Sequence, residues 1–152
     1  MAPLVVMVVV WIVSRLLGAA GIWESASTWV GSLRFALFAM FLFTAISHFH
    51  PRTRQDLIRM VPPSMPAPGL LVSVTGMFEV LGAIGLLVPQ LSAAAAYGLI
   101  ALLAAMFPAN IHAARAGLDV AGRAATPVAW RLPLQLFWMG ALWCVARATT
   151  LT

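Results

Sequence analysis

Five long apolar stretches, separated by short links, dominate the sequence. They cover residues 4–20, 33–49, 70–88, 93–113 and 132–146. About 20 apolar residues in a helix span the ~30 Å hydrocarbon core of a bilayer, where backbone polar groups find no partner outside the chain. We therefore predict an all-α membrane protein with five transmembrane helices, in a single membrane domain that covers residues 1–152. Because Met1-Ala2-Pro3 carries no basic side chain, the first stretch is expected to be a span or signal anchor.

The composition supports the membrane assignment and excludes several classes of protein. Apolar residues make up 62% of the chain and charged residues 9%, against roughly 25% charged residues in soluble domains. The net charge of +5 comes from arginines beside apolar runs, which is typical of topology determinants, so no nucleic-acid partner is expected. The single cysteine, Cys144, excludes an internal disulfide. The sequence has no phosphate loop, dinucleotide fingerprint or zinc-ligand spacing, so no metal site is predicted.

The distribution of arginines predicts an orientation. The second and fourth links lie on the side of the N-terminus, and they hold Arg52, Arg54, Arg59, Arg115 and Arg123, with Arg131 at the boundary. The opposite side has Arg34 and Arg147 at helix edges. Under the positive-inside rule, the N-terminus lies in the cytoplasm and the C-terminus outside.

The link at 51–69 has two parts. Residues 51–60 mix arginines with Leu57, Ile58 and Met60, which predicts a short amphipathic helix on the membrane surface. Four prolines then fall between residues 62 and 68. They predict that residues 61–69 lie extended across the cytoplasmic mouth of the bundle.

Polar residues inside the spans are the candidate binding residues, because such residues are costly in a membrane. At ~1.5 Å per residue, His48, Asn110, Arg131 and Gln135 reach a similar level near the cytoplasmic face, and Glu79 lies ~13 Å deep. Gly76 and Ala83 share a helical face with Glu79, so this face should pack closely and Glu79 should point into the bundle.

Structural roles compete with binding for several of these residues. Arg15 lies at a matching depth, so Glu79 and Arg15 could form a structural ion pair; alternatively Glu79 binds a ligand or a proton, or stays neutral while Arg15 reaches outward. Asn110 could satisfy a backbone carbonyl that Pro108 leaves free. His48 and His112 could in principle ligate a haem, but interfacial histidines more commonly form hydrogen bonds, and haem is not expected.

Several short motifs between residues 48 and 135 resemble those of the DoxX-like family of small bacterial membrane proteins. They are His48-Phe49-x-Pro51, the proline-rich run 61–68, Gly76-Met77-Phe78-Glu79-Val80-Leu81-Gly82, Gly85-Leu86-Leu87-Val88-Pro89, Met106-Phe107-Pro108-Ala109-Asn110-Ile111 and Arg131-Leu132-Pro133-Leu134-Gln135. The resemblance implies a four-helix transmembrane bundle at residues 33–149, with residues 4–20 as an extra N-terminal helix. It also implies a bacterial cytoplasmic (inner) membrane protein whose motif polar residues are His48, Glu79, Asn110, Arg131 and Gln135.

Two functions follow from these residues and from the redox associations of the family, which include thiosulfate–quinone oxidoreductase subunits and oxidative-stress assemblies. The first is a redox- or quinone-associated membrane subunit that binds a lipophilic small molecule near Glu79, with a partner membrane or redox protein or a second copy of the chain. The second is a non-catalytic scaffold, assembly factor or small-solute carrier whose buried polar network is structural.

Overall fold

The computed structural model describes residues 2–120, 122–124 and 126–150. Its elements, in chain order, are α1 (Ala2–Ala19), the 3₁₀ helix η1 (Glu24–Ala26), α2 (Trp29–Phe49), α3 (Pro51–Met60), α4 (Pro68–Leu87), α5 (Ser92–Arg115), β1 (Asp119–Val120), β2 (Arg123–Ala124) and α6 (Val128–Thr150). Within this part of the chain, α1, α2, α4, α5 and α6 are long and apolar enough to cross a membrane. The predicted all-α membrane architecture with five such helices is confirmed.

Local signals at the helix ends explain why several helices exceed their predicted bounds. The helix α2 begins at Trp29 because the Thr28 hydroxyl accepts a hydrogen bond of 3.0 Å from the backbone N–H of Gly31. The helix α5 ends where Gly117 adopts a φ of 61°, and Leu118 N–H donates back to the Ala113 carbonyl at 3.1 Å. This is a glycine C-cap, in which the residue after the helix adopts a left-handed conformation that residues with a Cβ atom disfavour.

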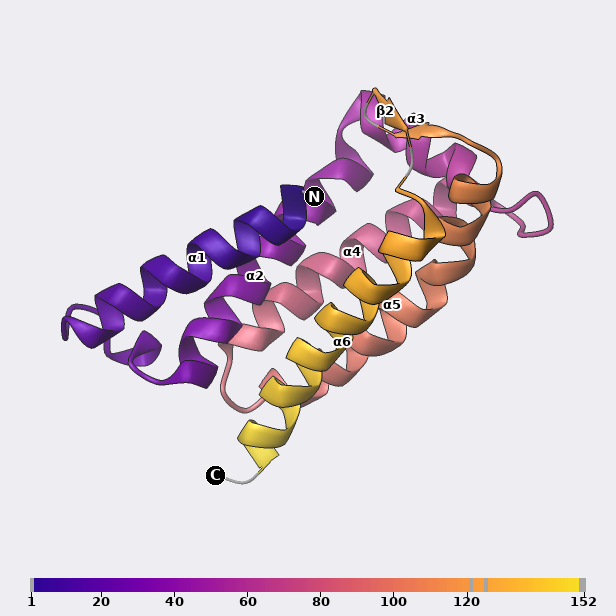
Figure 1. Cartoon of the computed structure of the whole chain (residues 1–152). Helices are drawn as coiled ribbons and strands as arrows, with labels where there is room; N and C mark the ends of the chain where they lie inside the picture. Colours follow the sequence, from indigo (N-terminus) through magenta and orange to yellow (C-terminus); the bar gives the residue numbers. More distant parts are fainter. Residues whose placement is uncertain (1, 121, 125, 151–152) are drawn as a thin grey trace.

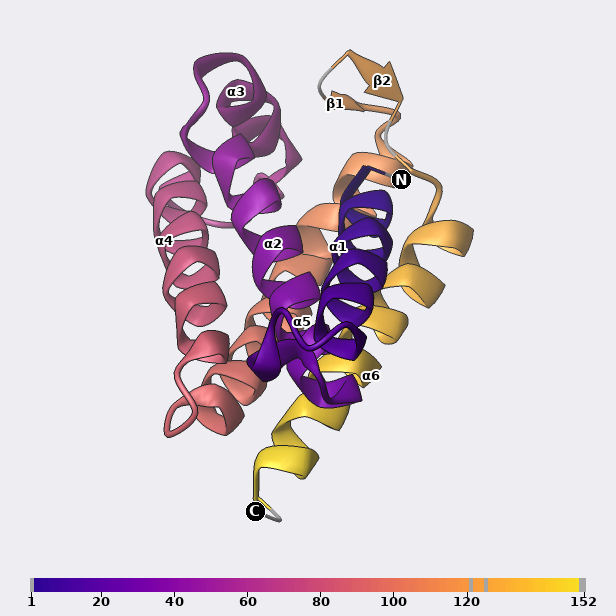
Figure 2. The same ribbon diagram turned by 90° about the vertical axis from the view of Figure 1, so that its left-hand side faces the viewer.

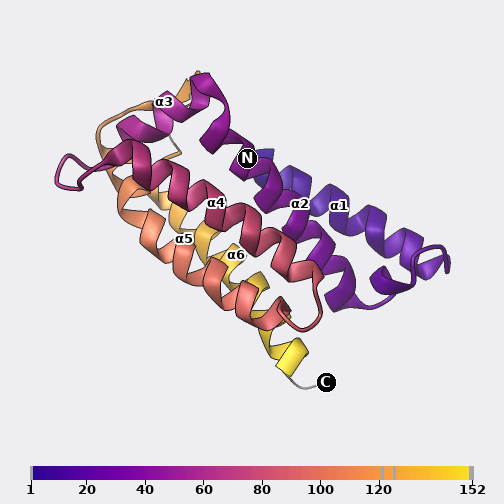
Figure 3. The same ribbon diagram turned by 180° about the vertical axis from the view of Figure 1, so that it is seen from behind.

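Four of the long helices form an antiparallel bundle. Each packs against the next in the order α2, α4, α5 and α6, and the N-terminal helix α1 packs along α2 outside the four (Figures 1 and 3). A four-helix bundle with one additional N-terminal helix is therefore confirmed. Figure 2 shows α3 and the small β1–β2 hairpin at one end of the bundle, which we call the α3 end, and the C-terminus at the other.

The apolar core fills the half of the bundle away from the α3 end. Its buried members come from the first half of α2 and the last half of α6, with residues of α1, α4 and α5: Met7, Leu33, Ala36, Leu37, Met40, Phe41, Ala83, Leu86, Ala96, Leu99, Leu103, Leu142, Val145 and Ala146. Small side chains let the helices approach closely there, as membrane helices commonly do. The polar candidate residues lie in the other half.

The buried stripe of α4 has the spacing of a helix-packing seam. Val72, Gly76, Glu79, Ala83 and Leu86 are all buried and recur every three or four residues. The prediction that Glu79 shares an interior face with Gly76 and Ala83 is confirmed.

The segment after α2 was predicted only in part. The short helix at residues 51–60 is confirmed as α3, and it packs against α2, α4 and α5. The extended path predicted for residues 61–69 is wrong: Met65 N–H donates to the Pro62 carbonyl at 2.9 Å in a turn, and α4 already begins at Pro68. Proline fixes φ near −65°, which suits a turn or a first helical residue as well as an extended chain.

The link between α5 and α6 holds a feature that sequence reasoning did not predict. Strands β1 and β2 pair antiparallel, with Asp119 opposite Ala124 and Val120 opposite Arg123. Gly122 lies in the connecting turn with a φ of 72°, the left-handed region that favours glycine in hairpins.

Candidate functional site: a polar cavity in the bundle

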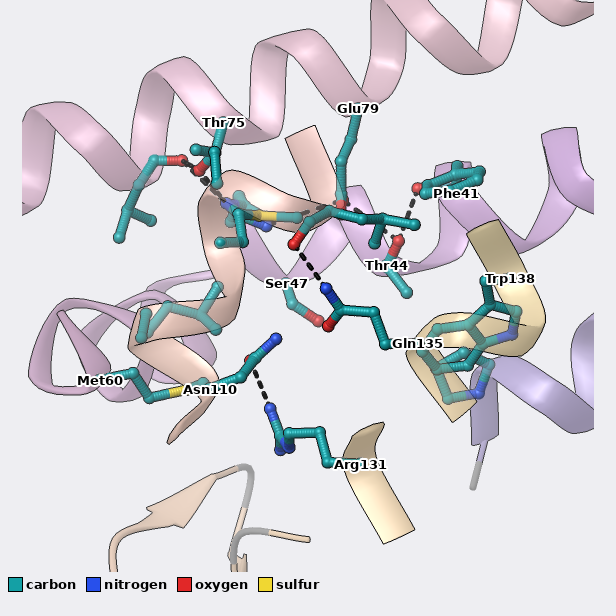
Figure 4. A pocket seen from close by; sticks show the side chains of 18 of the residues that line it. Phe41, Thr44, Ser47, Met60, Thr75, Glu79, Asn110, Arg131, Gln135 and Trp138 are labelled. Atoms are coloured by element: carbon teal, nitrogen blue, oxygen red, sulfur yellow. Dashed lines mark hydrogen bonds and ion pairs between the residues drawn. The ribbon is translucent and has the colours of Figure 1, made fainter. Parts of the chain in front are cut away.

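A cavity of about 500 Å³ lies inside the bundle at the α3 end. Its walls come from the last half of α2 and from facing parts of α4, α5 and α6, while α3 and the turn after it cover it (Figure 4). The lining residues are Pro3, Met40, Phe41, Thr44, Ser47, His48, Leu57, Met60, Val61, Met65, Leu71, Val72, Thr75, Glu79, Leu103, Ala105, Met106, Ala109, Asn110, Thr126, Arg131, Leu134, Gln135 and Trp138.

All five candidate binding residues line this single cavity: His48, Glu79, Asn110, Arg131 and Gln135. They come from the four helices α2, α4, α5 and α6, so the bundle brings together residues that lie far apart in the sequence. Most of the remaining lining is aliphatic, aromatic or methionine. A mostly apolar hollow with a few convergent polar groups is the usual form of a small-molecule site.

Glu79 is 4% exposed, and its carboxyl group has two polar neighbours on α2. The Thr44 hydroxyl lies 3.1 Å from Glu79 Oε2, and His48 Nε2 lies 3.6 Å from the same oxygen. Thr44 is also 3.0 Å from the Phe41 carbonyl. Since a hydroxyl has one proton, Thr44 can donate either to Glu79 or to Phe41, and in the second case a protonated Glu79 can donate to Thr44.

The tautomer of His48 follows from its other nitrogen. His48 Nδ1 lies 2.8 Å from the Val72 carbonyl oxygen, which can only accept, so Nδ1 carries a proton and donates it. An unprotonated Nε2 would then present a lone pair to Glu79 and repel an ionised carboxylate. The favourable arrangement has one proton, either on Nε2 or on the carboxyl group. At 3.6 Å the two atoms are too far apart for a hydrogen bond, but they are close enough to interact electrostatically, and both side chains line the cavity.

The close approach of His48 to α4 depends on Gly76. A Cβ atom at position 76 would lie 2.5 Å from His48 Cβ and 2.8 Å from His48 Cγ, which is too close for carbon atoms. The glycine thus makes room for the imidazole beside the helix that carries Glu79.

Arg131 and Asn110 form a second polar group in the cavity. Arg131 Nη1 donates to Asn110 Oδ1, and Figure 4 shows the two side chains pointing toward one another across the cavity. A guanidinium group only donates, so the amide oxygen of Asn110 must face it and the amide N–H groups are left for other partners. The structure shows no hydrogen bond from the Asn110 amide N–H groups to the Ala104 carbonyl, which Pro108 leaves free, among the described residues; the contact of Asn110 is with Arg131 instead.

Gln135 of α6 donates a hydrogen bond to α5 close to this position. Its Nε2 donates to the Leu103 carbonyl at 2.7 Å, one residue before Ala104, the position whose helical partner Pro108 removes. Gln135 is 5% exposed, and the bond ties α6 to α5 at the floor of the cavity.

Arg15 does not pair with Glu79. The Arg15 guanidinium donates to the Ser27 carbonyl at 2.5 Å, near the start of α2. The sequence-based depth was wrong because it assumed that all spans begin at one level. Pro3, in the first turn of α1, already lines the cavity, so Arg15 lies ~18 Å further along α1, toward the opposite end of the bundle.

His112 lies outside the cavity lining that contains His48. Its Nδ1 is 3.0 Å from the Met60 carbonyl, which fastens the end of α3 to α5. Arg54 makes a second fastening: its guanidinium donates to the His48 carbonyl at 3.2 Å and to the Gly69 carbonyl at 3.0 Å. His112 and Arg54 therefore have structural roles: their hydrogen bonds attach α3, which covers the cavity, to α5, α2 and α4.

Sequence reasoning missed the hydroxyl residues Thr44, Ser47 and Thr75, which line the cavity. A signal for them was present. Thr44 and Ser47 lie four and one residues before His48, and Thr75 lies four residues before Glu79, so Thr44 and Thr75 each share a helical face with a candidate residue.

The fold and this cavity define a multi-pass helical membrane protein with a largely apolar cavity that holds a few polar side chains. The chain belongs to the family described as a domain of unknown function, DUF8561, which matches residues 37–146. The matched region runs from α2 into α6 and contains every lining residue except Pro3. No curated protein matches the chain, and no solved structure matches it.

Proposed function

We propose that this protein binds a lipophilic small molecule of the quinone class in the cavity beside Glu79, and serves as a membrane subunit for a redox partner. The DoxX-like motifs support the redox association, and they remain a resemblance. One observation carries the binding proposal: hydrogen-bond donors from α5 and α6 and the neighbouring side chains of His48 and Glu79 line one largely apolar hollow of about 500 Å³.

Quinones suit such a site for chemical reasons. Their ring and tail are apolar, and their carbonyl oxygens accept hydrogen bonds from groups such as Arg131, Asn110 and Gln135. Reduction of a quinone adds protons to those oxygens, and a buried carboxyl–imidazole pair can supply or accept one. The electrons must come from a partner, since the sequence has one cysteine and no recognisable flavin or iron–sulfur motif.

We further propose that the α3 end faces the cytoplasm of a bacterium and that the protein resides in its inner membrane. The α3 end carries Arg52, Arg54, Arg59 and Arg115, with Arg123 in the nearby hairpin and Arg131 at the start of α6. The other end has Arg15, Arg34 and Arg147. The larger number of arginines at the α3 end supports a cytoplasmic orientation.

Quinone binding can be measured by quenching of tryptophan fluorescence, because Trp138 lines the cavity. Purified protein in mild detergent is titrated with a short-chain ubiquinone, and its lipid extract is analysed for quinones. Gln135→Ala removes a cavity donor and should weaken binding about fivefold or more, the effect of roughly one hydrogen bond. Gln90→Ala, an exposed glutamine between α4 and α5, is the matched control and should leave binding unchanged.

A non-catalytic scaffold, assembly factor or small-solute carrier is the alternative. It is favoured by the observation that the main polar side chains already have partners within the chain: Glu79 with Thr44, His48 with Val72, Asn110 with Arg131 and Gln135 with Leu103. A quinone-free extract together with no quenching would reject the quinone proposal and support this alternative.

A further inference from the structure

We infer that the lipophile carries one ionised oxygen group, such as a carboxylate or the ionised hydroxyl of a hydroxyquinone, and that this group binds Arg131 and Asn110. The inference rests on the proposed function, because it names the chemical class of ligand for the same cavity. Three observations carry it: the charge of the lining, the surplus of donors and the position of Arg131 in its helix.

The described lining carries an uncompensated positive charge. Glu79 is its one carboxylate, and a proton on either Glu79 or His48 Nε2 leaves that pair of side chains neutral. Arg131 remains as a permanent cation. Its described hydrogen bond goes to the neutral amide of Asn110 rather than to a carboxylate. A charge inside a membrane protein is costly unless an opposite charge lies near it, so an anionic ligand would balance the cavity.

The donors around Arg131 exceed the acceptors that the chain provides. A guanidinium has five N–H donors, and the described structure uses Nη1 on Asn110 while Arg131 Nε is buried without a partner. Because Asn110 turns its oxygen toward Arg131, its amide N–H groups are also left over. A ligand oxygen is the natural acceptor for this set, and an ionised one makes the stronger, charge-assisted bonds.

A cation at the position of Arg131 does not stabilise helix α6. Arg131 is the fourth residue of α6, close to the positive end of the helix dipole, where an anion is favoured and a cation is not. Arg131 and the α6 N-terminus thus add positive potential to the same side of the cavity. The rest of the lining is mostly apolar, including Leu57, Met60 and Trp138, and fits a hydrocarbon body attached to the anionic group.

A matched pair of probes tests this inference. One is a 2-hydroxy-3-alkyl-1,4-naphthoquinone, used at a pH where its hydroxyl is ionised, and the other is its 2-methoxy ether, which has the same body and no charge. Both are titrated into the purified protein, with binding followed by tryptophan quenching. The wild-type protein should bind the ionised quinone about tenfold more tightly than the ether, the effect of a charge-assisted hydrogen bond.

Variants identify the residues that cause the preference for the ionised quinone over its ether. Arg131→Gln should remove it, so that the two probes bind about equally, and Asn110→Leu should reduce it while leaving the cation in place. Arg52→Gln makes the same change at an exposed arginine of α3 and should keep the full preference. Displacement of the bound quinone by decanoate, but not by decanol, would extend the ligand class to fatty-acid anions, whereas displacement by neither would restrict it to ionised quinones.

The outcomes separate the two proposals. If the ether binds wild-type protein as tightly as the ionised quinone, the anionic ligand is rejected and the lipophile site stands. If neither quinone binds, the proposed function itself is rejected. The wild-type comparison holds even if Arg131→Gln fails to fold, and an unchanged preference in a folded Arg131→Gln protein would overturn the role of Arg131.

Discussion

Gly76 of α4 lies directly against His48 of α2, so closely that a Cβ atom on the glycine would be 2.5 Å from His48 Cβ. The Nδ1 atom of the same imidazole also bonds to the Val72 carbonyl, one turn earlier on α4. Neither helix can therefore give way without disturbing the pair of His48 and Glu79. The close packing of α2 against α4 therefore also sets the geometry of His48 and Glu79 in the cavity.

Gly76→Ala should therefore destabilise the protein by about 2 kcal/mol, the usual cost of overpacking a filled interface. Gly98→Ala is the matched control, because a Cβ atom on Gly98 of α5 would have no neighbouring atom within 4 Å, and alanine favours a helix by about 0.5–1 kcal/mol. The free energy of unfolding in mixed micelles measures both effects. Equal stability of the two variants would contradict the close packing at His48.

Glu79→Gln should retain the fold. A glutamine can accept a hydrogen bond from Thr44 and donate one to His48 Nε2, so the free energy of unfolding should stay within about 1 kcal/mol of wild type. Glu79→Leu leaves Thr44 and His48 without this polar neighbour and should lower the free energy of unfolding by about 1–3 kcal/mol. If Glu79→Gln folds but loses quinone binding, the carboxyl group or its proton is functional; a Glu79→Leu protein as stable as wild type would contradict a stabilising role for the polar cluster.

Arg15 and Glu79 should be energetically independent. The structure pairs Arg15 with the Ser27 carbonyl and Glu79 with Thr44. A double-mutant cycle of Arg15→Gln and Glu79→Gln should give a coupling below about 0.5 kcal/mol, as for separated sites. The comparison cycle of Thr44→Val and Glu79→Leu should give about 1 kcal/mol. A large Arg15–Glu79 coupling would restore the ion pair that the sequence suggested.

The five helices and the grouping of His48, Asn110, Arg131 and Gln135 could be predicted because they depend on position along the chain. Hydrophobic length gives the spans, and counting residues from one membrane face gives a common level for side chains on different helices. The interior direction of Glu79 followed from the small residues on its helical face.

The misses at the site share a physical cause, because each depends on how helices are placed relative to one another. The level at which α1 begins decides the partner of Arg15, and the rotation of α2 against α4 brings His48 Nε2 to Glu79. The cavity itself arises because α2 and α6 pack through their ends away from α3 and leave space between Thr44 and Gln135. Residue spacing along one chain does not specify any of these three relationships.

The orientation can be tested with single cysteines at the two ends of the bundle. Gln55 is exposed on α3, and Gln90 is exposed in the short link between α4 and α5, at the opposite end. Cys144, the single native cysteine, is exposed on α6 and is first replaced by alanine so that it takes up no reagent.

With the α3 end in the cytoplasm, Gln90→Cys should react with a membrane-impermeant maleimide applied from the outer side of the membrane, and Gln55→Cys should react only after the membrane is opened. The prediction follows from the larger number of arginines at the α3 end, since positively charged segments are retained on the cytoplasmic side. Inverted vesicles provide the control, because the two positions should exchange their reactivity. Labelling in the reverse pattern would reject the orientation and keep the five spans, whereas labelling of both positions from one side would reject the spanning of α4.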